Sequence, residues 1–499
     1  MSILSVSSSY AKIRSLIDNT TTDALPPPSS ITAGVESLPA NLTAHGLGEE
    51  ATEAHLLSDI CPGFNGPKTS PNYYGFVTGG VFPIAEVADN IVTAFDQNVG
   101  VHLPEQSIST VVEDKALGML VELLKLDRGN HWQGRTFTTG ATGSNVLGLA
   151  CGREAVISTR LRAAGESHGV GELGLLAACA KAGIKEIQIL TTMGHSSLYK
   201  AASVVGIGRA SVKDIPSSSR EPWKLDMSAL ERELKREQDG IVSIVALSAG
   251  EVNSGRFATS GSSSVARIRD LCTKYGAWLH VDGAFGIFAR SLPETAEFAA
   301  LGTASSGLEL ADSITGDGHK MLNVPYDCGF FLTRSAATLA SVFQNPNAAY
   351  LATTGPSSIP SPLNIGLENS RRFRALPVYA VLLAYGSSGL AEMFSRQVRL
   401  TRGIAAYVQE SEEYELLAQG EDQKGDFSNT HIIVIFRARD EVLNQKLVEK
   451  INATRKMYVS GTKWDGKPAC RVAVSTWRVE VQRDVKLVRG VLEGVSRDA

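Results

Sequence analysis

The sequence is poor in cysteine and has no long apolar run. Its six cysteines among 499 residues lie far apart, with no CxxC pair and no histidine at zinc-ligand spacing. This spacing excludes a disulfide scaffold and a zinc module, and it is typical of proteins of a reducing compartment. No apolar stretch approaches the ~20 residues that a membrane-spanning helix needs. We therefore expect neither a membrane protein nor a metal site.

An excess of positive charge is also absent. Lys and Arg total 48 and Asp and Glu total 52, which gives a formal net charge of −4. Nucleic acids and anionic membranes need clustered positive charge, so neither is expected as the main partner. Hydrophobic residues make up 43% and charged residues 20% of the chain, ordinary values for a globular protein with a sizeable core. The length predicts one large domain and one smaller domain.

The first residues lack the apolar segment of a secretory signal. MSILSVSSSYAKIRSL is rich in serine and contains Lys12 and Arg14, as mitochondrial presequences do, but Asp18 follows soon after and argues against one. A cytoplasmic location is the default expectation. Residues 1–70 have the least regular pattern, and TTTDALPPPSS at 20–30 is typical of a linker.

Beyond residue 85, short apolar runs alternate with helical patterns. Helices are expected at 85–97, 110–126, 196–206, 227–237 and 262–276, and strands at 186–192, 241–247, 277–282, 311–315 and 328–333. Strands that are apolar nearly throughout, with helices between them, predict a mostly parallel sheet covered on both faces.

A second, smaller set of elements follows a long helical segment near 370–408. It consists of strands at 431–436 and 469–475, a helix near 440–454 and a final helix. We expect an α/β fold with three parts: an N-terminal segment at 1–84, a large mostly parallel-sheet domain at 85–390, and a small C-terminal α+β domain at 391–499.

In sheets of this kind, ligands bind at the carboxyl ends of the strands. A glycine-rich turn that opens a helix, TTGATGSNVLGLACGREA, lies near such an end. Gly140 and Gly143 would let the backbone approach a ligand, and Thr142 and Ser144 add hydroxyl groups. The N–H groups of the helix start would then hold an anion such as a phosphate. A tight turn with a helix cap explains the same residues, and no GK[ST] follows as in a P-loop.

Three further residues lie just after expected strands. Asp282, in AWLHVDGAFG, either caps a loop or faces a cationic ligand atom, with Gly283 and Ala284 leaving room for a flat ring. Lys320, in ADSITGDGHKMLNVPYDCG, is either a solvated surface charge or an amine of lowered pKa that forms a Schiff base. His195, in MGHSSLYKA, is either a partly buried structural residue or a residue of the site.

The order of these features along the chain is more specific than any one of them. A phosphate-binding turn, a histidine, a strand-end aspartate and then a lysine match the needs of pyridoxal 5'-phosphate. The helix start would hold the phosphate, and the aspartate would keep the pyridine nitrogen protonated. The protonated ring could then accept the electron pair left when a bond at Cα breaks.

These blocks resemble the group II pyridoxal-phosphate-dependent amino-acid decarboxylases, the family of the aromatic-amino-acid, tyrosine, histidine and glutamate decarboxylases. The resemblance covers about residues 70–490. HVDGAFG and DGHKMLNVPYDCG are its most specific blocks, supported by YYGFVTGG, SAGEVNSGRF, SRRFRALPVYA and RVAVSTWR. It implies fold type I, the aspartate aminotransferase fold, and a homodimer with its active site at the subunit interface.

The resemblance also implies roles for individual residues. Lys320 would form the internal aldimine with the cofactor, Asp282 would pair with its pyridine nitrogen, and His195 would stack on its ring. The other implied contacts are Ala284 on the opposite ring face, Ala141 and Thr142 at the phosphate, Asp317 and His319 beside the lysine, and Thr78 at the substrate.

The product depends on one more residue. NAAYLATTG resembles the mobile catalytic loop of the family, and Tyr350 matches the tyrosine that is taken to protonate the carbon that has lost CO₂. Relatives with phenylalanine there tend to consume oxygen and release an aldehyde. Tyr350 therefore favours plain decarboxylation to an amine, although an ordinary loop tyrosine is the alternative.

Several positions depart from the family pattern. Gly283 and Phe285 replace an alanine and a tyrosine, Met321 stands where tryptophan is usual, Glu251 replaces threonine or asparagine, and Gly143 replaces a glutamate. None of these changes removes a catalytic group, but they could reshape the pocket.

The sequence therefore predicts a pyridoxal-phosphate-dependent decarboxylase of an L-amino acid, with an aromatic substrate favoured by family analogy. An oxidative decarboxylase that releases an aldehyde, a carbon–carbon lyase and a non-catalytic paralogue remain as alternatives. An acidic substrate would need a cationic anchor, which the sequence does not place in the pocket.

Overall fold

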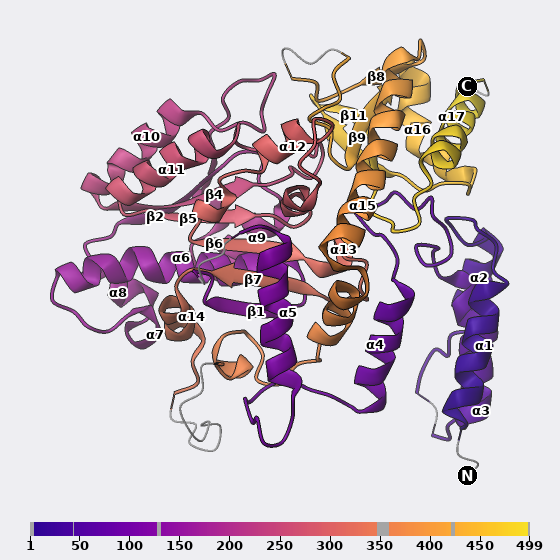
Figure 1. Cartoon of the computed structure of the whole chain (residues 1–499), viewed down its shortest axis with the longest axis horizontal. Coiled ribbons are helices and arrows are strands. Elements are labelled where there is room, and N and C mark those ends of the chain that lie inside the picture. The colour runs from indigo at the N-terminus through magenta and orange to yellow at the C-terminus, as the bar shows by residue number, and fades with distance from the viewer. Residues whose placement is uncertain (1–3, 43, 127–130, 347–358, 421–424, 498–499) are drawn as a thin grey trace.

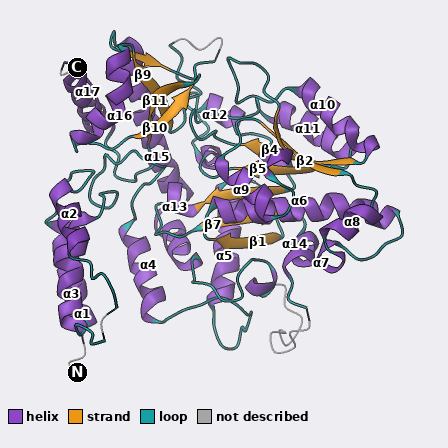
Figure 2. Cartoon of the chain, turned by 180° about the vertical axis from the view of Figure 1, so that it is seen from behind, coloured by secondary structure: helices purple, strands orange, loops and turns teal. Residues whose placement is uncertain are grey.

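The computed structural model describes residues 4–42, 44–126, 131–346, 359–420 and 425–497. The strands form two separate sheets, and helices surround them (Figure 2). The larger sheet has seven strands in the order β1-β7-β6-β5-β4-β2-β3, and the smaller has four in the order β10-β11-β9-β8. This arrangement confirms the expected large α/β unit and the smaller α+β unit.

The large sheet is parallel from β6 to β3 and antiparallel where β7 joins β6 and β1. Its strands are β1 (Gly134–Thr138), β2 (Glu186–Thr191), β3 (Val212–Asp214), β4 (Ile241–Ser248), β5 (Trp278–Asp282), β6 (Ser313–Asp317) and β7 (Gly329–Thr333). The short strands β1 and β3, both at edges of the sheet, were not expected from the sequence. Their sequences, GRTFT and VKD, contain one apolar side chain each and so lack the apolar run by which most of the other strands were found.

The two faces of the large sheet pack against different helices. Along β4, Val245 and Leu247 join one core and Ile244 and Ala246 the other, as the alternation of side chains in a strand requires. The first core contains residues of α5 (Ser109–Leu123), α10 (Met227–Lys235), α11 (Ser262–Lys274) and α15 (Ala375–Glu410). The second contains residues of α6 (Ala141–Ala163), α8 (Leu175–Lys181), α9 (Ser196–Val204) and α14 (Ala336–Phe343).

Helix α15 passes from the large sheet to the small one (Figure 1). Gly386, at φ 56°, interrupts it, and its second half packs against β8, β9 and α17. The small unit consists of β8 (Tyr414–Leu416), β9 (Ile433–Ala438), α16 (Glu441–Ala453), β10 (Ser460–Trp464), β11 (Lys467–Ala473) and α17 (Val481–Arg497). The chain near Tyr74 also joins this unit, because the Tyr74 carbonyl accepts the Ala473 N–H at 2.9 Å.

The first seventy residues are more regular than the sequence suggested. They form α1 (Val6–Asp18), α2 (Pro28–Glu36) and α3 (Glu49–His55), and α4 (Pro83–Ala94) follows. The expected linker at 20–30 ends in a helix, because Pro28 occupies the first helical position, where its missing N–H costs nothing. Figure 1 shows these helices beside α4 at one edge of the molecule. No helix in the described part of the chain is both long and apolar enough to cross a membrane.

Candidate active site

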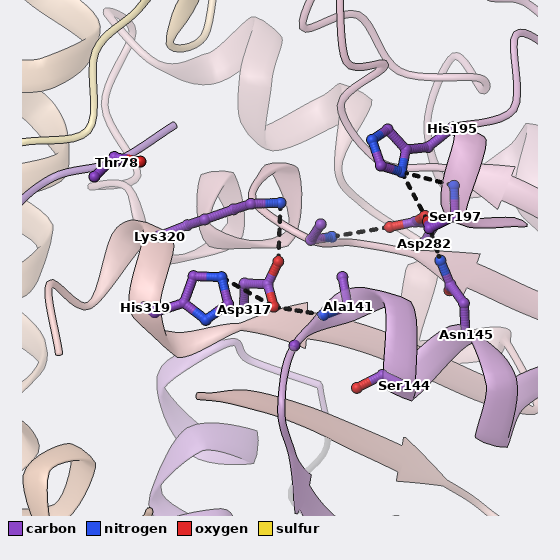
Figure 3. A network of polar contacts seen from close by, with 12 residues as sticks. Thr78, Ala141, Ser144, Asn145, His195, Ser197, Asp282, Asp317, His319 and Lys320 are labelled. Carbon is purple, nitrogen blue, oxygen red and sulfur yellow. Dashed lines mark hydrogen bonds and ion pairs between the residues drawn. The ribbon is translucent and has the colours of Figure 1, made fainter. Parts of the chain in front are cut away.

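A cavity of about 410 Å³ lies at the carboxyl ends of the parallel strands. Asp282 is the last residue of β5 and Asp317 the last of β6, and His195 caps the helix that follows β2. The N-terminus of α6 reaches the same place from β1 (Figure 3). Eight of the residues to which the resemblance gives a role line this cavity: Ala141, Thr142, His195, Asp282, Ala284, Asp317, His319 and Lys320.

Lys320 lies in α13 (Gly318–Met321), the single helical turn that follows β6. Its Nζ is 2.8 Å from Asp317 Oδ2 and 6.0 Å from the centre of the Phe285 ring, and 18% of its side chain is exposed. The amine is therefore not a solvated surface charge. It reaches into the cavity, where a carboxylate balances its charge.

Asp317 connects the lysine to the start of α6. Its side chain is almost fully buried, and Oδ1 accepts a hydrogen bond from the Ala141 N–H at 2.6 Å. The Nε2 atom of His319 lies 3.7 Å from the same oxygen. A buried carboxylate needs such partners, because an isolated charge in the interior is very costly.

His319 is held as a neutral ring. Burial lowers its pKa, and its Nδ1 accepts the Cys328 N–H at 3.2 Å. The ring packs on Tyr326, tilted by 30°, with 4.3 Å between ring centres. Tyr326 lines the cavity and bonds to Thr78 through its hydroxyl group, with 3.1 Å between the two oxygens. Thr78 thus reaches the cavity through Tyr326 and is not one of its lining residues.

Asp282 faces the cavity with both carboxylate oxygens bonded to neutral donors. Oδ2 accepts from Asn145 Nδ2 at 2.8 Å, and Oδ1 accepts from the Ala284 N–H at 3.3 Å. His195 lies nearby on the cavity wall (Figure 3), and burial lowers the pKa of its imidazole. Neither of these contacts is an ion pair, so the carboxylate of Asp282 can bind a cationic atom of a ligand.

The start of α6 can hold an anion. Gly140 precedes the helix at φ 154° and, as the N-cap residue, has no side chain that could bond to the first turn. The Ala141 N–H is used by Asp317, but the next two N–H groups, of Thr142 and Gly143, begin the helix on the cavity wall. A Cβ on Gly143 would lie 3.2 Å from Thr139 Oγ1. A side chain at this position would therefore need Thr139 to shift by a few tenths of an ångström.

The other departures from the family pattern have separate places. Phe285 lines the cavity, whereas Met321 is fully buried in the core of the large sheet. The carboxylate of Glu251 accepts hydrogen bonds from the backbone N–H groups of Asn253 and Ser254 at 2.9 and 2.7 Å, so it caps its own loop. Of these three side chains, Phe285 is the one that shapes the cavity.

Arg471 is a cavity residue that sequence reasoning missed. It belongs to β11 of the small sheet, is 5% exposed, and its Nε donates to the Val252 carbonyl at 2.6 Å. Burial lowers its pKa to about 10, so the guanidinium remains charged at neutral pH. RVAVSTWR was noted as a family block, but its first residue meets the cavity only because β11 lies against the loop that follows β4, where Val252 accepts its hydrogen bond.

Tyr350 lies outside the described residues, so the structure does not place it. The described residues also contain no cluster of His, Cys, Asp and Glu side chains able to hold a metal ion.

Residues 66–428 match the conserved domain of the pyridoxal-dependent decarboxylases. The chain belongs to this family. It is 28% identical over 342 residues to an L-2,4-diaminobutyrate decarboxylase of Acinetobacter baumannii, and this alignment covers 67% of this chain and 62% of that protein. It is 26% identical over 475 residues to tryptophan decarboxylase 1 of Oryza sativa subsp. japonica, which covers 88% of this chain and 83% of that protein.

The fold is also shared with solved members of the family. The crystal structure of Oryza sativa TDC with PLP and tryptamine matches with a TM-score of 0.80 at 21% identity, covering 100% of this chain and 99% of that one. The chain is thus a fold type I enzyme, a carboxy-lyase whose cofactor is pyridoxal 5'-phosphate. The open helix start, the half-buried lysine and the strand-end aspartate described above form a donor set that fits this cofactor.

Proposed function

We propose that this protein decarboxylates an L-amino acid to the corresponding amine and CO₂, with Lys320 as the lysine that binds the cofactor. The observation that supports this most is the meeting of Lys320, Asp282, His195 and the start of α6 around one cavity. Bound pyridoxal phosphate supplies a carbonyl carbon that an amine can attack and a ring that accepts the electron pair released at Cα.

The residues of the chain then have separate tasks. The N–H groups of Thr142 and Gly143 bind the phosphate, and the helix dipole adds to that attraction. Asp282 holds a proton on the pyridine nitrogen by its negative charge. Asp317, 2.8 Å from Lys320 Nζ, stabilises the ammonium form of the lysine whenever that amine is released.

We further propose an aromatic amino acid as the substrate. The cavity wall carries three aromatic side chains, Phe76, Phe285 and Tyr326, which suit a flat apolar group. One observation favours a second substrate class. Arg471 brings a buried positive charge to the same cavity, and a guanidinium binds a carboxylate well. It serves either the α-carboxylate of any amino acid or the side chain of an acidic one.

Mass spectrometry of the products tests this proposal. The purified protein is incubated with pyridoxal phosphate, air and the twenty amino acids, and with Lys320→Ala as the control. One new amine, absent with the variant, is the expected result and identifies the substrate. An aldehyde in its place would favour the oxidative alternative. A protein that binds the cofactor and changes no amino acid in the pool would favour the non-catalytic alternative.

We also propose that the protein is a homodimer. The outer face of α4 and the residue after it carry Ile84, Val87, Ile91 and Phe95, whose exposures run from 36% to 72%. An apolar stripe of this kind on one helix is typical of a protein–protein interface. Sedimentation of the wild type should give twice the chain mass, and Val87→Glu with Ile91→Glu should give monomers. Monomeric wild type at micromolar concentration would contradict the proposal.

We propose a cytoplasmic location because the cysteines form no disulfide. All six are free thiols, as is usual where disulfides are kept reduced. Microscopy of a fluorescent fusion in the source cells tests it, and an organellar signal would contradict it.

A further inference from the structure

A continuous line of hydrogen-bonded side chains runs behind the cavity and ends at His195. It begins at Trp278, whose Nε1 donates to Ser313 Oγ at 2.9 Å, and that hydroxyl lies 2.8 Å from His280 Nδ1. The line then continues to Asn145, because His280 Nε2 lies 2.9 Å from Asn145 Oδ1. All these side chains but Trp278, at 7%, are fully buried.

Asn145 is the branch point of this line. One proton of its Nδ2 goes to Asp282 Oδ2 at 2.8 Å, and the other goes to Ser197 Oγ at 3.0 Å. Ser197 Oγ lies 2.7 Å from Nδ1 of His195 (Figure 3). The line therefore connects Asp282 with His195, and both of these residues line the cavity.

The chemistry of the groups sets the direction of every bond. A carboxylate only accepts, so the amide of Asn145 must present its nitrogen to Asp282, which leaves Oδ1 for His280. His280 must then carry its proton on Nε2, which donates to that oxygen. Its Nδ1 is left as an acceptor for the Ser313 hydroxyl. This agrees with the far end of the line, where the indole of Trp278 can only donate to Ser313.

The same reasoning fixes His195. The Ser197 hydroxyl accepts from Asn145 and has one proton left, which points to His195 Nδ1. The backbone N–H of Ser197 also donates to that nitrogen at 3.2 Å. A ring nitrogen that receives two donors is an acceptor without a proton. Because burial lowers the pKa of His195, its ring is neutral at neutral pH, and the proton is on Nε2.

We propose that Asn145 and Ser197 are positioning residues that fix His195 in its Nε2–H form, so that the imidazole offers the cavity a hydrogen-bond donor and never a base. His280 holds Asn145 from behind. The role in catalysis rests on the proposed function, since His195 would then donate to an oxygen of the bound substrate or cofactor. The protonation pattern itself does not depend on turnover.

Nitrogen NMR of the imidazole rings tests the pattern directly. The holoenzyme is prepared with ¹⁵N-labelled histidine, and His195→Gln and His280→Gln identify their signals among the nine histidines. We expect each ring as a single Nε2–H tautomer. A proton on Nδ1 of His195, or a mixture of both forms in the wild type, would overturn the proposal.

Variants separate the line from general packing. Ser197→Ala and Asn145→Leu should each bring in the second tautomer of His195, whereas Ser197→Thr, which keeps the hydroxyl, should not. Two buried residues outside the line serve as controls: Ser305→Ala, whose hydroxyl bonds to Leu301, and Asn444→Ala, which bridges the small sheet to α16. A single unchanged tautomer in both test variants would also overturn the proposal.

A kinetic measurement then tests the consequence. Loss of one hydrogen bond worth about 1.4 kcal/mol is a tenfold change. We therefore expect kcat/KM to fall about tenfold in Ser197→Ala and to stay within twofold in Ser305→Ala. If the tautomer of His195 changes but kcat/KM does not, the hydrogen-bonded line fixes the tautomer as proposed, and the imidazole has no part in catalysis. If no substrate reacts at all, the proposed function fails and the NMR result still stands.

Discussion

The ammonium of Lys320 and the carboxylate of Asp317 lie 2.8 Å apart within one helical turn, and the same carboxylate accepts the first N–H of α6. One buried acid thus links the amine of Lys320 to the start of α6 on the cavity wall. Asp317 contacts both Lys320 and the start of α6, and it is the last residue of β6. The distance between the lysine and the helix start is therefore set by the sheet and not by a flexible loop.

This relationship predicts the stability of variants in the absence of cofactor. Lys320→Ala leaves Asp317 buried without its cation, and we expect the free energy of unfolding to fall by about 1–3 kcal/mol. The double variant Lys320→Ala with Asp317→Asn removes both charges and should recover most of that loss, because no unpaired charge remains. Denaturant unfolding of the cofactor-free proteins measures both effects. Equal losses that simply add in the double variant would show that the two groups are not coupled.

Arg471 should affect substrate use far more than it affects folding. Its guanidinium is buried against a backbone carbonyl and faces the cavity, so Arg471→Gln removes a costly buried charge along with a carboxylate-binding group. A hydrogen bond to a charged group is worth about 1.5–3 kcal/mol, so kcat/KM should fall about 10- to 100-fold. The melting temperature should change little.

Steady-state kinetics of Arg471→Gln and a matched control test this. Arg256 is also buried, but its guanidinium lies 6.0 Å from the centre of the Trp223 ring in a different cavity. Arg256→Gln should leave KM within twofold. Equal changes in both variants would mean that the effect comes from general loss of structure.

The sequence predicted most of the fold because the central strands carry unusually clear signals. The strands β2, β4, β5 and β7 are buried on both faces, so their apolar runs are nearly continuous. The strand β6 (SITGD) is equally buried but has one apolar side chain, Ile314. The N-terminal helices were missed for the opposite reason. α1 has no buried residue and α2 only Gly34, so neither helix contributes a large side chain to a core.

Some residues of the candidate site could likewise be predicted from the sequence, and others could not. Asp282, Asp317 and Lys320 follow strands and could be placed at one edge of the sheet from their positions in the sequence. Arg471 could not, because it reaches the cavity through the contact of β11, in the small sheet, with the loop that follows β4. Asn145 was also missed, because it lies inside α6 and its role depends on contacts with β5 and α9, which no local pattern encodes.

His431 predicts a pH-dependent stability. It is fully buried between Phe257 and Phe285, and neither of its ring nitrogens has a hydrogen-bond partner among the described residues. Burial lowers its pKa from 6.5 to about 3. Below pH 6.5 the imidazole of His431 binds a proton in the unfolded chain but stays neutral in the folded protein. The free energy of unfolding therefore falls as the pH falls toward 3.

His431→Leu should therefore stabilise the protein, and by more at low pH. Removing an unsatisfied buried polar group is worth about 1–2 kcal/mol at pH 8. Between pH 6.5 and pH 5 the advantage should grow by about 2 kcal/mol, since one proton corresponds to about 1.36 kcal/mol for each pH unit. Unfolding curves at pH 8 and pH 5 measure it, with the exposed His168→Leu as the control. An equal advantage at both pH values would contradict the prediction.

Tyr350 predicts which product leaves the enzyme. If this tyrosine delivers the proton to Cα after CO₂ is lost, Tyr350→Phe removes the acid and leaves the carbon open to oxygen. The amine should then give way to the aldehyde, with oxygen consumed and ammonia and hydrogen peroxide released. General acid catalysis typically contributes about 10²- to 10⁴-fold, so amine formation should fall by at least about 100-fold. Product analysis under air and under nitrogen separates the two reactions. An unchanged yield and rate of amine in air would show that the proton comes from another group.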